Sequence, residues 1–342
     1  MRNLLNGNQH WIFKKIKQQR ITKSMRLCEE EIAARIYNYE HPKRIAFSKK
    51  YPFLKKPIIF SRHAARNVQN FFDTRIKYKK KTSFYTCIIA RHQSVLRRKL
   101  GDSDPKLQEE KIVNLRQAVQ QLNGIVIQPQ AIFSLWNSIG KPKYKKGYVD
   151  GMLLANGRVV KGIGGGLCQL SNFLYWILLH APIKTMERYH HSIDVFPDSG
   201  RTLPFGGGAT ILYNFIDLKV KNVSPYPFQL KIWLSDNHLK GQILSPHPAL
   251  QKFHISEKNH VFVKRGKRYF RYNEIYRETK VKGEVIKTEK ITTNFAPVLY
   301  KVTPAYLHKN KFKVLDFTNK KIENPLNRTN ELTSSTYKKK YD

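Results

Sequence analysis

The sequence has few cysteines, and none of them forms a closely spaced pair. Three cysteines occur in 342 residues, at Cys28, Cys87 and Cys168, with no Cys-x-x-Cys motif. A disulfide framework and a zinc ribbon both need more cysteines at shorter spacings. We therefore expect the chain to stay in a reducing compartment.

Long apolar runs are also missing. The amino terminus is basic, but its apolar group Trp11-Ile12-Phe13 is short and is followed at once by Lys14 and Lys15. This is neither a signal-peptide core nor a membrane span, and no later stretch approaches about 18 uninterrupted apolar residues. We expect a protein that is made and kept in the cytoplasm, with peripheral contact to the inner membrane face as an option.

Acidic residues are scarce relative to basic ones. The chain has 63 Lys and Arg against 24 Asp and Glu, which gives a formal net charge of +39. Such a charge favours an anionic partner, which can be nucleic acid, an acidic membrane face or an anionic cell-wall precursor. Nucleic acid is the least expected of the three, because the sequence carries no zinc-finger, RNP-like or helix-turn-helix signature. The alternative is a lysine-rich surface that is only solvated.

The composition changes along the chain predict four regions. Residues 1–83 form a basic leader with helical segments, of which 29–39 has the spacing of an amphipathic helix. Residues 84–245 form the main α+β domain, 246–308 a small appended β-hairpin region, and 309–342 a basic, mostly disordered tail.

The main domain has clear periodicities. Apolar residues recur at helical spacing over 112–122, which ends before Gly124, and over 170–178. Residues 209–220, 228–234 and 239–244 are rich in β-branched or aromatic residues, and a turn over 235–237 joins the last two. The sequence thus predicts a helix followed by antiparallel strands.

Cys168 is the leading candidate for chemistry. It follows Gly164-Gly165-Gly166 and opens the predicted helix, where unpaired backbone N–H groups and the helix dipole can lower a thiol pKa. The glycines allow a tight turn and a close approach of another molecule. The alternative is that Cys168 is a small buried apolar residue and that the glycines only serve the turn.

A nucleophilic thiolate also needs a base. His190 and His191 follow the predicted helix, and Asp194 or Asp217 can orient an imidazole. Adjacent residues on a strand point to opposite faces, so at most one of the two histidines is expected in the site. The order Cys, His, Asp is similar to that of papain-like and transglutaminase-like enzymes, with Cys168, His191 and Asp217 as the catalytic residues. A metal site on Cys168 and His191 lacks a third ligand, and we expect neither metal nor cofactor.

Several segments together resemble the VanW family of glycopeptide-resistance accessory proteins. They are Phe133-Ser134-Leu135-Trp136, Gly147-Tyr148, Gly164 to Asn172, and Ile216 to Asn222. One departure is that many members have an Asp before the Ala-Thr pair, where this chain has Gly208 before Ala209 and Thr210. If that Asp completes a catalytic triad, only Asp217 or Asp194 can replace it here.

The resemblance implies an accessory role in cell-envelope or glycopeptide-resistance physiology. The first hypothesis is a Cys168-dependent acyltransferase or hydrolase acting on a wall precursor. Its substrate would contact Gly164, Gly165, Gly166, Gln169 and Ser171, with Gln169 as a donor to an oxyanion. The second is a non-enzymatic binding module for an anionic envelope precursor or for the membrane, and the third is nucleic-acid binding.

Overall fold

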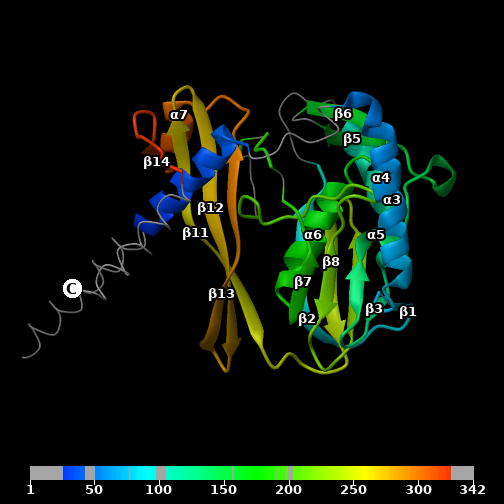
Figure 1. The fold of residues 1–342 in the computed structure, drawn as a ribbon. Helices are drawn as coiled ribbons and strands as arrows, with labels where there is room; N and C mark the ends of the chain where they lie inside the picture. The colour runs from blue at the N-terminus through cyan, green and yellow to red at the C-terminus, as the bar shows by residue number, and fades with distance from the viewer. Residues whose placement is uncertain are drawn as a thin grey trace, which may run out of the picture.

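The chain folds as a mixed α+β protein with antiparallel sheets, as the sequence predicted (Figure 1). A computed structural model describes residues 26–42, 51–76, 78–97, 105–155, 158–190, 192–195, 197–198 and 203–324. The finer expectation, a papain-like or transglutaminase-like arrangement, stays a prediction.

A five-stranded antiparallel sheet forms the centre of the main domain. Its strands, in spatial order, are β1 (Lys79–Lys80), β3 (Ile125–Ile127), β9 (Phe228–Leu234), β10 (His238–Ser245) and β2 (Cys87–Val95). Strands β9 and β10 pair directly through the turn at Ser235. This confirms the hairpin that was predicted from the β-branched or aromatic residues of both segments and from the turn between them.

Three helices pack with this sheet around one apolar core. They are α4 (Lys106–Leu122), α5 (Leu135–Ile139) and α6 (Leu167–Leu179). The apolar residues of α4 recur every three or four positions, so this helix buries one face, while α6 is buried over most of its circumference from Leu170 onward. Helix α4 stops where predicted, and Gly124 follows it with φ of +88°. A left-handed residue at this place is a common helix ending, and glycine adopts it without strain.

A three-stranded sheet of β4 (Ile132–Ser134), β8 (Lys219–Asn222) and β7 (Ile183–Glu187) completes the domain, together with the hairpin of β5 (Asp150–Ala155) and β6 (Arg158–Ile163). The strand predicted over 209–220 is wrong for most of its length. Residues before β8 form only isolated bridges, Thr210 with Tyr189 and Leu212 with Ile216. Asn214, with φ of +59°, turns the chain between the last two, so no extended run continues.

The carboxyl-terminal region is a larger sheet than predicted. Three strands of 14 residues each, β11 (Lys252–Arg265), β12 (Arg268–Val281) and β13 (Glu284–Pro297), pair antiparallel. After α7 (Pro304–Lys309), strand β14 (Lys313–Asp316) joins β11 in parallel. The predicted disordered tail is therefore wrong for β14, while residues 325–342 lie outside the described ones.

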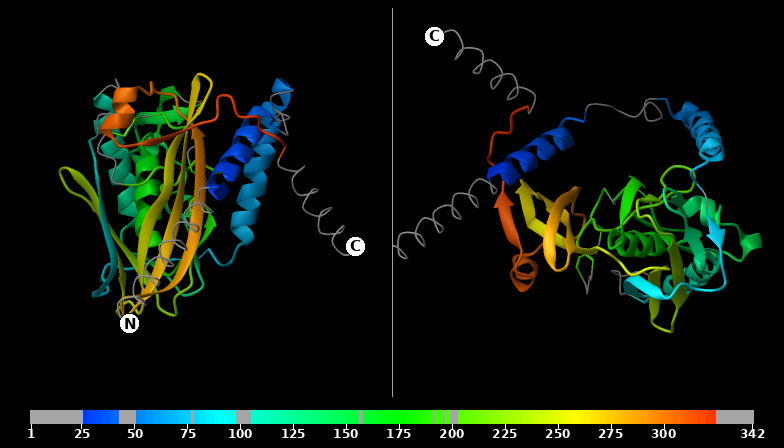
Figure 2. Two further views of the ribbon diagram at one scale, coloured as in Figure 1. Left: turned by 90° about the vertical axis from the view of Figure 1, so that its left-hand side faces the viewer. Right: turned by 90° about the horizontal axis from the view of Figure 1, so that it is seen from below.

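Two amino-terminal helices lie on different parts of the molecule (Figure 2). Residues 26–40 form a helix that contains the one predicted at 29–39, and its Ile32 and Ile36 are fully buried in a cluster with Val263 and Tyr272 of the carboxyl-terminal sheet. A short η1 (Pro52–Leu54) leads into α3 (Lys55–Phe72), which lies along the main domain. No helix within the described part of the chain is long and apolar enough to cross a membrane.

Candidate functional site

The glycine turn before Cys168 is closely packed against its own protein. It joins β6 to α6, and a Cβ atom on Gly165 would stand only 2.0 Å from the carbonyl carbon of Gly151 in β5. The buried side chain of Asn114 fixes the glycine turn against the residues before β5. Its Nδ2 donates to the Gly165 carbonyl at 2.9 Å, and its Oδ1 accepts from the Val149 N–H at 2.9 Å. Packing therefore accounts for Gly165 without a ligand.

The two flanking glycines have a conformational reason as well. Gly164 and Gly166 have φ of +72° and +92°, a region that other residues rarely adopt. A Cβ on Gly166 would also meet Lys111 Cγ at 2.1 Å. The turn is thus filled by protein atoms, and its contact with a substrate stays a prediction.

Cys168 is the second residue of α6 and packs against the apolar core. Burial away from water raises the pKa of its thiol, and a hydrogen bond with the backbone of Ile211 lowers that pKa by less. The sequence predicted that the helix start can lower this pKa, whereas the burial of the thiol acts in the opposite direction. Whether the thiol is catalytic stays a prediction.

The polar residues after Cys168 have partners inside the protein. Gln169 Nε2 donates to Ser94 Oγ at 3.0 Å and to the Val95 carbonyl at 2.8 Å, which ties α6 to β2. The fully buried Ser171 donates its hydroxyl to the Ala209 carbonyl at 2.6 Å. The side chains of Gln169 and Ser171 therefore point toward strands and loops of the domain. Their contact with a substrate stays a prediction.

The departure from the family pattern at Gly208 has a local cause. Asn172 of α6 accepts a hydrogen bond from the Ala209 N–H through its Oδ1, at 2.8 Å. A Cβ on Gly208 would stand 2.1 Å from that same oxygen. In this chain, an Asp at position 208 would require Asn172 to move.

Asp217 lies buried at the start of the three-stranded sheet. Its Oδ2 accepts from Ser134 Oγ at 2.5 Å, and its Oδ1 accepts from the N–H groups of Trp136 at 3.1 Å and Leu218 at 2.8 Å. Burial raises the pKa of Asp217, and these hydrogen bonds partly offset the rise. These hydrogen bonds tie the start of α5 to the residues before β8. The Asp217 carboxylate therefore stabilises the fold in this geometry.

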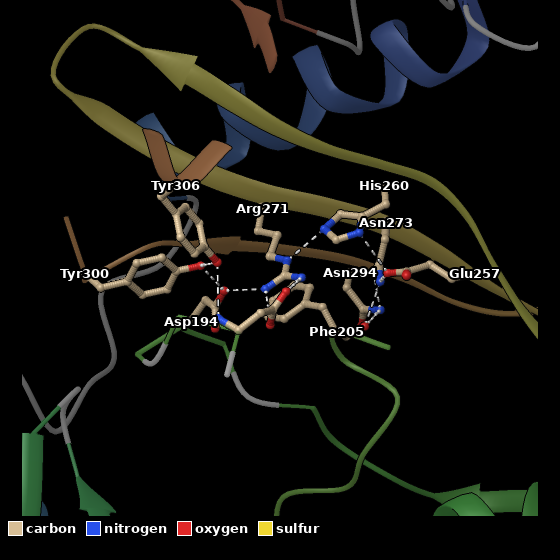
Figure 3. A network of polar contacts seen from close by, with 10 residues as sticks. Asp194, Phe205, Glu257, His260, Arg271, Asn273, Asn294, Tyr300 and Tyr306 are labelled. Atoms are coloured by element: carbon tan, nitrogen blue, oxygen red, sulfur yellow. Dashed lines mark hydrogen bonds and ion pairs between the residues drawn. The ribbon is translucent and has the colours of Figure 1, made fainter. Parts of the chain in front are cut away.

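The other predicted acid–base residues are dispersed. His191 lies outside the described residues, and His190 lines a groove that is described below. Asp194 Oδ2 accepts from Arg271 Nη1 at 3.2 Å and from the Tyr300 hydroxyl at 3.1 Å (Figure 3). A base for the thiol of Cys168 stays a prediction.

Arg271 is the centre of the network drawn in Figure 3. This fully buried residue of β12 also donates to both carboxylate oxygens of Asp198, and its Nε donates to His260 Nε2 at 2.9 Å. The two aspartates keep the pKa of Arg271 above its ordinary value despite burial. The network joins the loop after β7 to the carboxyl-terminal sheet.

A groove of about 870 Å³ lies between β7 and the edge strand β13. Five cationic side chains and one carboxylate line it, namely Lys184, Arg188, Arg277, Lys287, Lys290 and Glu289. Glu289 is already paired, because it accepts from Arg277 Nε at 2.6 Å and from Lys287 at 3.1 Å. The lining therefore has an excess of positive charge.

Arg188 is a cation of this groove whose partners are uncharged. Its guanidinium lies 5.0 Å above the Tyr175 ring and donates to the carbonyl oxygens of Gly206 and Gly208. No carboxylate within the described ranges pairs with it, and desolvation lowers its pKa. Arg188 was not among the predicted site residues, although it stands between Glu187 and Tyr189 directly before the candidate histidines.

A metal centre has no support in the part of the chain that the structure describes. No three His, Cys, Asp or Glu side chains there converge as the ligands of a metal ion would. Asp194 and Asp198, which lie close together, both pair with Arg271.

Comparisons with known proteins place the main domain in a family. A family model described as VanW like protein matches residues 110–244. Vancomycin B-type resistance protein VanW of Enterococcus faecalis is 31% identical over 195 residues, which cover 56% of this chain and 71% of that protein. The uncharacterized protein YoaR of Bacillus subtilis is 25% identical over 118 residues, or 34% of this chain and 37% of that protein. No solved structure matches the chain.

Proposed function

This chain belongs to the VanW family, and we propose that it binds an anionic cell-wall precursor in the groove between β7 and β13 as a non-enzymatic accessory protein of envelope physiology. Its relation to a vancomycin resistance protein supports the physiological setting. The groove supports the binding role.

Arg188 is the observation that carries this proposal. A half-buried guanidinium without a carboxylate partner among the described residues is costly, because its lost hydration is replaced only by two carbonyl dipoles and an aromatic face. A bound phosphate or carboxylate would supply the missing charge and accept paired N–H donors. Lys184, exposed at the same groove, adds a second cation.

The size and surroundings of the groove support a ligand larger than a simple ion. Ligand sites commonly have volumes of about 300–1,000 Å³, and the 870 Å³ here fall within that range. Tyr189 and Ile291 offer apolar surface beside the cations, while Tyr175 is buried under Arg188. A nucleotide-linked or lipid-linked wall precursor combines phosphate charge with apolar or peptide parts, so it suits this lining.

A cysteine-dependent acyl or peptide-bond reaction on the same precursor is the second candidate. The placement of Cys168 at the start of α6 favours it. Against it stand the raised pKa of the thiol and the structural partners of Gln169, Ser171 and Asp217. The geometry therefore favours binding over catalysis.

Calorimetric titration of the full chain with a uridine-diphosphate-linked muramyl pentapeptide tests the proposal. Lys184→Glu reverses an exposed charge in the groove and should weaken binding by about tenfold or more. Lys267→Glu makes the same change at the exposed β11–β12 turn, outside the groove, and should change affinity little. Affinity should also fall as salt rises.

Two results would contradict the proposal. One is equal weakening by Lys184→Glu and Lys267→Glu, which would assign the effect to net charge. The other is a new peptide or acyl product, seen by mass spectrometry after incubation with the precursor and abolished by Cys168→Ser. That product would establish the enzymatic candidate instead.

A further inference from the structure

Helix α3 docks on the main domain through polar side chains. Arg66 forms an ion pair with Glu187 of β7, and Asn67 Oδ1 accepts from Asn214 Nδ2 at 3.0 Å. One turn further along, Asn70 Oδ1 accepts from Lys219 Nζ at 2.7 Å. The face of α3 that an ordinary surface helix would fill with apolar residues is therefore polar.

Away from these contacts, α3 exposes large apolar side chains. Phe60, Val68 and Phe72 are 75%, 54% and 72% exposed. Their spacings of eight and four residues spread them over roughly 120° of the helix circumference. Phe53, in the preceding η1, is 75% exposed as well. Single exposed apolar residues are ordinary, but such a set on one helix marks an interaction surface.

The charge of α3 selects the kind of partner. The helix contains Lys55, Lys56, Arg62 and Arg66 and no Asp or Glu. Lys56 and Arg62 are exposed, so they can reach anionic groups at the edge of an apolar surface while their alkyl stems stay on it. The whole chain carries a formal charge of +39, which attracts the same partner from a distance.

We propose that α3 and η1 form a membrane-docking surface that lies in the headgroup region of an anionic phospholipid bilayer. Phe53, Phe60, Val68 and Phe72 enter the boundary between headgroups and acyl chains, while Lys56 and Arg62 contact lipid phosphates. The polar face of α3 keeps its contacts with β7 and β8, so docking requires no unfolding. This inference goes beyond the proposed precursor site and does not rest on it.

Sedimentation of the full chain with phospholipid vesicles tests this surface. The chain should bind vesicles of mixed phosphatidylglycerol and phosphatidylcholine, and bind pure phosphatidylcholine much more weakly. The double variant Phe60→Ser, Phe72→Ser should lose at least about tenfold in vesicle affinity. The matched variant Leu250→Ser, Leu299→Ser, which removes side chains that are 76% and 54% exposed outside α3, should bind like the unchanged protein.

Thermal unfolding serves as the folding control, since exposed side chains contribute little to stability. Equal vesicle binding by the α3 variant and the unchanged protein overturns the proposal. So does equal loss in the matched variant, or equal binding to neutral vesicles. If instead Phe60→Ser, Phe72→Ser changes only self-association in analytical ultracentrifugation, the occupant of the surface is a second copy of the chain.

Discussion

Ser134 and Asp217 lie 83 positions apart in the sequence, and the Ser134 hydroxyl donates to Asp217 Oδ2 at 2.5 Å. Ser134 also caps α5, because its Oγ accepts from the Asn137 N–H at 3.1 Å. The contact joins the Phe133–Trp136 segment to the Ile216–Asn222 segment, two of the stretches that carry the family resemblance. Ser134 and Asp217 stabilise the fold, and this role explains why a hydroxyl and a carboxylate stand at these two positions.

Replacement of Asp217 should separate a structural carboxylate from a catalytic one. Asp217→Ala leaves the N–H groups of Trp136 and Leu218 without their acceptor, so we expect a loss of about 3 kcal/mol in unfolding free energy. Asp217→Asn keeps an oxygen that accepts from both N–H groups and adds an amide donor toward Ser134. We therefore expect it to lower the unfolding free energy by about 1 kcal/mol or less. Urea denaturation measures both, and equal losses would show that the negative charge itself is needed.

The thiol of Cys168 should react slowly at neutral pH. Burial raises its pKa, so the thiolate fraction should grow only above the ordinary value of 9.0. The measurement is the alkylation rate of Cys168 against pH, in a variant with Cys28→Ala and Cys87→Ser, folded and in urea. Faster alkylation in urea than in the folded protein is expected. A folded thiol that titrates below its unfolded value would revive the nucleophile hypothesis.

Substitution of Gly165 should disrupt packing rather than ligand binding alone. Gly165→Ala places a methyl group 2.0 Å from the backbone of Gly151, which forces β5 and the turn apart and should cost about 3 kcal/mol or more. Gly266→Ala is the comparison, because its Cβ meets nothing within 4 Å and its cost comes only from the φ of +60°, which Gly165 does not share. It should cost about 1 kcal/mol. Similar losses in thermal or urea unfolding would argue against steric contact at Gly165.

The elements with a strong local pattern were predictable. Helix α6 repeats apolar residues at helical spacing, and β9 and β10 are rich in β-branched or aromatic residues on both sides of a polar turn, so neither prediction needs a distant partner. The bounds of β11 to β13 were underestimated, because Lys, Arg and Glu on their solvated faces broke the apolar pattern into short pieces. Strand pairing over 14 residues tolerates those charges.

The site was less predictable than the fold. The partners of Arg188 and Arg271 come from segments far away in sequence, and Asp194 pairs with Arg271 across 77 positions. Local spacing carries no information on such pairs. Cys168 was correctly placed at a helix start, but its pKa depends on the apolar neighbours that burial supplies, and these are known only after the chain has folded.

Removal of Arg271 should weaken the attachment of the carboxyl-terminal sheet. Arg271→Met removes the guanidinium that pairs with the buried Asp194 and with Asp198, so we expect a loss of about 3–5 kcal/mol. Arg268→Met, at an exposed position of the same strand, should change stability little. Addition of Asp194→Asn and Asp198→Asn to Arg271→Met should restore part of the loss. If it restores nothing, the charge balance is not what the network provides.

His180 should make stability depend on pH in the weakly acidic range. Burial at the end of α6 lowers its pKa below the ordinary 6.5, while its Nδ1 donates to the Trp176 carbonyl at 2.9 Å. The nearby His254 and Arg277 lower the pKa further, because they oppose a positive charge. The unfolded chain therefore binds a proton more readily than the folded one between the two pKa values.

The sign follows from that difference in proton binding. The contribution of His180 is fully present above about pH 6.5, and it falls as pH drops through the window down to the folded pKa. His180→Gln should remove about 1 kcal/mol of the difference in unfolding free energy between about pH 7.5 and about pH 5.5. His254→Gln, at an exposed position, is the control and should keep most of that difference. A pH dependence unchanged in His180→Gln would mean that other histidines produce it and that the end of α6 tolerates a charged imidazole.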